Sequence, residues 1–227
     1  MSKGYHVVAV IGLSLVLASC GEDSVPPSGP RTERAPVPAV KLRANSVSRT
    51  QIRELGAQAL FSSIDESECV ITDVFVVGAE QAAKQGPGKP TTGPLAIVQI
   101  FQFNVCTFEL LRDVFGETND AIVQANRSRL SRATLEATIP AFDFLNQVEI
   151  QVVVDLAWTA VGALTSESER FRLKGPTAHV NFSLKGTSRP AEASGTVVVG
   201  GENLATSALF ADIYRARLAL FERLNTP

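Results

Sequence analysis

The chain has few of the residues on which most catalytic and nucleic-acid-binding sites depend. Its 227 residues include 2 histidines, 3 cysteines, 1 tryptophan and 2 tyrosines. So few histidines exclude a histidine-rich metal centre, and so few Trp and Tyr side chains offer little surface for base stacking. Neither sign of charge is in excess, because 21 Lys and Arg stand against 23 Asp and Glu. The overall charge therefore predicts no binding of nucleic acid or another polyanion.

Long apolar runs are also scarce, and the clearest one lies close to the N-terminus. Lys3 is followed by the uncharged run 7–17 (VVAVIGLSLVL). A membrane-spanning helix needs about 20 apolar residues, whereas the apolar region of a secretory signal peptide needs about 7–15. We expect a signal peptide at 1–19. The alternative is a buried helix of the core.

The end of this run carries a family motif. Leu17-Ala18-Ser19-Cys20 resembles the lipobox of bacterial lipoproteins. The resemblance implies that Cys20 takes a lipid on its thiol, becomes the new N-terminus and receives a further acyl chain such as palmitate. Several acyl chains anchor a protein stably to a membrane. In this family an Asp directly after the lipidated cysteine retains the protein at the inner membrane. Gly21 stands at that position here, so the resemblance implies location at the outer membrane if the cell has two membranes.

Residues 20–44 predict a lipidated cysteine followed by a tether. The segment is rich in proline and poor in apolar residues, so it favours an extended spacer over a packed core. Its prolines are Pro26, Pro27, Pro30, Pro36 and Pro38. We expect a single β-rich domain at 45–227.

Within 45–227 apolar and polar residues alternate with a period of two, which is typical of β-strands. The clearest alternation covers 148–158, and others cover 69–79, 95–107, 134–139, 171–173, 178–185 and 195–199. About seven strands separated by turn residues predict a mainly β, antiparallel β-sandwich or barrel-like fold. Residues 154–159 (VDLAWT) and 189–196 (RPAEASGT) resemble segments of uncharacterised exported bacterial proteins, which implies no particular activity.

Helices are expected to be secondary. Residues 207–224 are amphipathic on a helical wheel and predict a C-terminal helix, with a final strand at 213–221 as the competing prediction. Residues 109–115 permit a short helix. No secondary structure is predicted for residues 46–61, although the spacing of their apolar residues also permits a helix.

Cysteine arithmetic predicts one disulfide. With Cys20 assigned to lipid, Cys69 and Cys106 remain as a pair in an exported, oxidising context. A hairpin between 69–79 and 95–107 that sets Cys69 opposite Cys106 would also set Phe75 opposite Ile100 and Val77 opposite Val98. The alternative is two free buried thiols.

Catalytic chemistry has little support in the sequence. His179 is the single histidine outside the signal peptide, and no G-x-S-x-G motif accompanies it. We therefore assign no catalytic residue, no metal ligand and no cofactor. A carboxylate-dependent site, either a hydrolase or a weak calcium site, would draw on Asp65, Glu66, Glu68, Asp73, Asp155, Glu167 and Glu169.

The function favoured by the sequence is a non-enzymatic binding or envelope-interaction module outside the cytoplasm. Its partners would be membrane lipid through the acylated Cys20, an envelope protein or a glycan, with no nucleic acid. Exposed loops carry most contact residues, and 80–94 is the longest candidate. The candidate contact residues in it are Lys84, Gln85, Lys89, Thr91 and Thr92. The alternatives are an extracytoplasmic hydrolase and a carrier of an apolar ligand.

Overall fold

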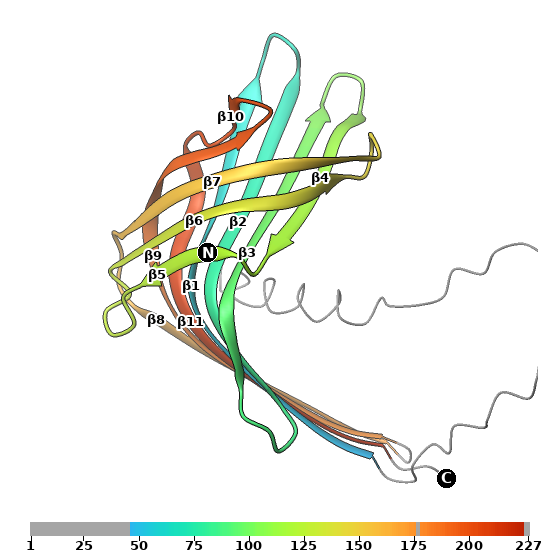
Figure 1. Ribbon diagram of the computed structural model, residues 1–227, viewed down its shortest axis with the longest axis vertical. Helices are drawn as coiled ribbons and strands as arrows, with labels where there is room; N and C mark the ends of the chain where they lie inside the picture. The colour runs from blue at the N-terminus through green and yellow to red at the C-terminus, as the bar shows by residue number, and fades with distance from the viewer. Residues whose placement is uncertain (1–45, 176–177, 225–227) are drawn as a thin grey trace, which may run out of the picture.

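The computed structural model describes residues 46–175 and 178–224 (Figure 1). The predicted signal peptide, Cys20 and the tether at 20–44 lie outside the described residues. The described residues form eleven strands and no helix: β1 (Ser46–Asp65), β2 (Val70–Gln85), β3 (Thr91–Asn104), β4 (Glu109–Thr118), β5 (Ala121–Ala125), β6 (Arg132–Asp143), β7 (Val148–Ala160), β8 (Thr165–Lys174), β9 (Ala178–Val199), β10 (Glu202–Asn203) and β11 (Ala208–Leu224). In this part of the chain no helix is long and apolar enough to cross a membrane.

The strands pair into one antiparallel sheet that closes on itself. The order β9-β11-β1-β2-β3-β4-β6 is closed by β7, which pairs with both β6 and β9. β4 pairs with the end of β6 and β5 with its first half, and β8 pairs with the first half of β9. The mainly β, antiparallel and barrel-like prediction is therefore confirmed.

Side chains fill the inside of the closed sheet. Trp158, Phe61 and Leu135 are at most 1% exposed there and belong to one large apolar cluster. The indole Nε1 of Trp158 donates a hydrogen bond to the main-chain oxygen of Gln58 across the interior, at 3.0 Å. The packed interior fixes the distance between opposite walls of the sheet.

Two glycines allow strands to come close together. A Cβ at Gly78 would lie 3.0 Å from the side chain of Leu135, so its absence lets β6 pack over β2. Gly195 has a φ of +132°, and a Cβ there would overlap the carbonyl oxygen of Asp155 on β7. Glycine tolerates this backbone region, which other residues rarely adopt.

The prediction of a C-terminal helix was wrong, and the competing prediction of a strand at 213–221 is confirmed. That segment lies in β11, while 109–115 and 46–61, which permitted a helix, lie in β4 and β1. β11 pairs with β1 on one edge and β9 on the other, and neighbouring side chains such as Ile213 and Tyr214 are buried on opposite faces. A strand that is apolar on both faces loses its alternation, so its sequence can pass for an amphipathic helix.

The predicted disulfide is present, although the hairpin register differs by one residue. Cys69 and Cys106 are bonded, with their Cα atoms 5.7 Å apart. The ladder sets Val76 opposite Val98 and Val77 opposite Ile97. Cys69 is outside the ladder, in the turn after β1 with a φ of 57°, and its carbonyl accepts a hydrogen bond from the Val105 amide. The bond joins two turns and therefore does not define the register.

Beyond the closed part the sheet continues as an open, curved extension. β8, the first half of β9, the second half of β11 and the start of β1 run together away from the closed part (Figure 1). The face of the sheet that lines the closed interior continues along this extension. This face connects the filled interior to a groove at the start of the extension.

Candidate functional site

A groove of about 900 Å³ lies where the closed part of the sheet meets the extension. Five strands and one crossing segment form its walls. They contribute residues 53–55 of β1, 80–82 of β2, 92–94 of β3, 185–187 of β9, 215–217 of β11, 121–124 of β5 and Arg127 in the loop after β5. The walls thus come from both halves of the chain.

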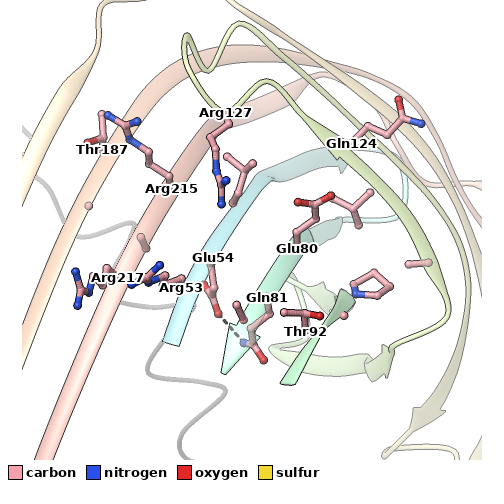
Figure 2. A pocket seen from close by; sticks show the side chains of 18 of the residues that line it. Arg53, Glu54, Glu80, Gln81, Thr92, Gln124, Arg127, Thr187, Arg215 and Arg217 are labelled. Atoms are coloured by element: carbon pink, nitrogen blue, oxygen red, sulfur yellow. Dashed lines mark hydrogen bonds between the residues drawn. The ribbon is translucent and has the colours of Figure 1, made fainter. Parts of the chain in front are cut away.

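Each of the five strands gives three consecutive residues to the groove, and the pleat points the first and third to one face. This is the face that carries Leu55 and Phe61 of the interior cluster. On it lie the cations Arg53, Lys185, Arg215 and Arg217, and Arg127 reaches in from the loop (Figure 2). Glu80 is the carboxylate among these inward-facing lining residues. The groove is therefore strongly basic.

Three of the cations form a row across adjacent strands. Arg53 of β1 is directly opposite Arg217 of β11, and Arg217 is directly opposite Lys185 of β9. Within the described residues, none of the three has a carboxylate at salt-bridge distance. Like charges directly opposite each other on a sheet cost about 0.2–1 kcal/mol per pair. The row by itself is destabilising, and an anion between the side chains would relieve the repulsion.

The same strands bury a carboxylate on their other face. Glu54 is 4% exposed, and its Oε1 accepts a hydrogen bond from Gln81 Nε2 at 2.8 Å. Burial raises the pKa of Glu54, and the bond from Gln81 only partly opposes this. Tyr214 lies opposite Gly56 on this face, and burial together with Glu54 and Asp212 raises its pKa well above the usual value. These groups favour their neutral forms.

Of the predicted contact residues, Thr92 lines the groove. Lys84, Gln85, Lys89 and Thr91 do not appear among its lining residues. Most of the candidate loop is strand, because β2 runs to Gln85 and β3 begins at Thr91. The groove thus involves the strands at the base of this hairpin and not its tip.

The seven candidate carboxylates are not gathered into one cleft, and none of them lines the groove. Asp65 accepts hydrogen bonds from Ser67 and Glu68 in the turn after β1, which lowers its pKa, and Asp73 accepts one from Ser62 Oγ at 2.6 Å. The described ranges contain no group of three His, Cys, Asp or Glu side chains able to hold a metal ion. The carboxylate-dependent hydrolase stays a prediction, with none of its candidate carboxylates in the lining of the groove.

The carrier of an apolar ligand also stays a prediction. The interior of the closed sheet is filled by apolar side chains, and the groove at its end has both charged and apolar walls. His179 lies on the extension, edge-on to the ring of Phe221 at 6.0 Å between centroids. It has no catalytic partner that the structure shows.

Sequence reasoning missed the basic face, although a signal was present. Cations recur at every second position in Arg215 and Arg217, and again in Arg170, Arg172 and Lys174. In a strand this spacing places all members on one face. The prediction that the chain binds no polyanion used its total charge. The total charge does not show that cations are gathered on one face of the sheet.

The sequence matches no protein-family model, no curated protein and no solved structure. The geometry of the groove and the lipobox resemblance are therefore the features that bear on function.

Proposed function

We propose that this protein is a lipid-anchored, non-enzymatic binding module outside the cytoplasm that holds an anionic ligand in its basic groove. The single observation that carries the proposal is the row of Arg53, Arg217 and Lys185, which has no carboxylate partner among the described residues. Sites that carry an unfavourable charge cluster without compensation favour a ligand of opposite sign.

The composition of the groove specifies the ligand further. Arginine outnumbers lysine there, and the planar guanidinium binds carboxylate or phosphate through two parallel hydrogen bonds. Leu55, Ala82 and Pro94 add apolar wall beside the cations. We expect a ligand with oxyanion groups on a partly apolar body.

The anchor follows from the resemblance of residues 17–20 to a lipobox. Through an acylated Cys20 and the tether at 20–44, the groove would act at the surface of the bacterial envelope, at the outer membrane in a cell that has one. Mass spectrometry of the purified protein should show an N-terminal Cys20 carrying acyl chains. An intact leader or an unmodified Cys20 would contradict the anchor.

The groove is tested with the full chain, produced with its own leader and purified in non-ionic detergent. Calorimetry with trigalacturonate and with pyrophosphate should detect binding of at least one of them. Arg217→Gln should weaken that binding about tenfold, the loss expected for one charged hydrogen-bond pair. Arg132→Gln, an exposed change away from the groove, is the matched control and should bind as the wild type does. Binding of neither probe, or equal effects of the two variants, would overturn the proposal.

A further inference from the structure

The basic face does not end at the groove. It continues onto the extension, where a second hollow of about 250 Å³ is lined by Arg49, Arg170 and Arg172. Register pairs join these residues across four strands, because Arg49 is opposite Phe221, Phe221 is opposite Asn181, and Asn181 is opposite Arg172. All lie on the same face as Arg53 and Arg217.

Carboxylates are absent from the lining of the second hollow as the structure describes it. Along the extension, the acidic residues of these strands alternate with the positions of the cations, so their side chains point to the opposite face of the sheet. Glu167 and Glu169 of β8 are opposite Gly186 and Leu184, which belong to the other face. The extension therefore separates its charges, with cations on the face that leads from the groove.

The spacing of the two sites requires a long ligand. Arg49 precedes Arg53 by four residues on β1, which corresponds to about 13 Å along a strand. A small anion held by Arg53 and Arg217 cannot also contact Arg49 or Arg172. A chain that leaves the groove along β1 and β11 can contact both sites.

The polar groups between the cations suit a sugar chain. Gln51, Asn181 and Ser183 line the second hollow, and in the described residues their side chains make no hydrogen bond within the protein. They are available to hydroxyl groups. Arg49 lies over the ring of Phe221 at 5.5 Å, which fixes the guanidinium on the surface. Among the described residues that line the groove and the second hollow there is no Trp or Tyr for stacking of successive bases, which disfavours nucleic acid.

We propose that the ligand is an extended anionic glycan, whose chain binds in the groove and continues across the second hollow on the extension. This inference rests on the proposed function, because it names the ligand of the same basic face. The proposal predicts that the affinity for the glycan rises with the length of the glycan chain. A site confined to the groove would show no such rise.

The test measures the binding of galacturonate oligomers from trimer to dodecamer to the full chain in non-ionic detergent. The wild type should bind the dodecamer at least tenfold more tightly than the trimer. The double variant Arg170→Gln/Arg172→Gln should bind the trimer as the wild type does but lose most of the gain in affinity for the dodecamer. Arg49→Gln, on another strand, should lose that gain as well. Neutral maltodextrins of equal length should not bind.

The outcomes separate the two proposals. If the trimer binds but affinity does not rise with length, or the variants keep the rise, the glycan path is wrong and the groove proposal stands. If neither trigalacturonate nor pyrophosphate binds, the groove proposal itself fails. A single-stranded oligonucleotide that binds more tightly than the dodecamer would overturn the assignment to a glycan.

Discussion

Arg53 and Arg217 are directly opposite each other on β1 and β11, and both face the groove. They are 164 positions apart in the chain (217 − 53), so folding alone brings the two charges together. Their closeness has an energetic cost that the fold does not offset with a carboxylate in the described residues. The proposed binding of an anion would offset this cost.

This pair predicts a trade-off between stability and binding. Arg217→Gln should raise the free energy of unfolding at low salt by about 0.4–2 kcal/mol, because it removes two like-charge pairs, with Arg53 and with Lys185. The gain should shrink in high salt, which screens the charges. Urea denaturation at two salt concentrations measures both effects. A loss of stability at low salt would argue against repulsion in the row.

The disulfide should make a large contribution to stability. Cys69→Ala should lower the free energy of unfolding by about 4 kcal/mol, the loop-entropy value for a bond that spans 37 positions. Denaturation with and without a reducing agent measures this loss. Reduction should destabilise the wild type similarly and leave the variant unchanged. Equal stability of wild type and variant under oxidising conditions would show that the bond contributes little.

Gly195 should not tolerate a side chain. Gly195→Ala should destabilise the fold by roughly 2 kcal/mol or more, because its Cβ overlaps the Asp155 carbonyl and its φ of +132° is strained for alanine. Gly88→Ala is the matched control, since a Cβ there meets nothing within 4 Å. Thermal unfolding should separate the two variants by several degrees. Similar melting temperatures would contradict the close approach of β7 and β9.

Glu54 should make stability depend on pH. Burial raises its pKa in the folded state above the ordinary value of 4.5. The folded form therefore holds this proton more tightly than the unfolded chain does. The resulting stability is complete below the ordinary carboxyl pKa and is lost as pH rises through the folded-state pKa.

Glu54→Gln removes the charge and can keep the contact with Gln81. It should raise stability at pH 7 by about 1 kcal/mol, since Glu54 Oε2 has no partner in the described residues. It should also flatten the pH dependence. Denaturation curves from pH 4 to pH 8 give the comparison. A variant less stable than the wild type at pH 7 would show that the charged form is favoured.

Local patterns predicted much of the fold. Alternation in 148–158 predicted most of β7, and the cysteine count predicted the bond between Cys69 and Cys106. Prediction failed for β11, where neighbouring side chains are buried on both faces. The hairpin register also failed, because Cys69 lies in a turn and not in the ladder. Both errors arise from contacts between strands that a single segment does not contain.

The groove could not be derived in the same way. Arg53, Arg217 and Lys185 come together because β11 pairs with both β1 and β9, and Arg127 joins them from the loop after β5. The period-two spacing of Arg215 and Arg217 shows that these two share a face. It does not show which other strands face them.

The most direct test of the basic groove is a residue-resolved measurement of arginine protection. The full chain in non-ionic detergent is treated with phenylglyoxal, with and without trigalacturonate or pyrophosphate, and modified arginines are identified by mass spectrometry. The account predicts that a bound anion protects Arg53, Arg215 and Arg217 severalfold while Arg112 and Arg132 react as before. Equal modification of all five arginines with and without either anion would contradict it.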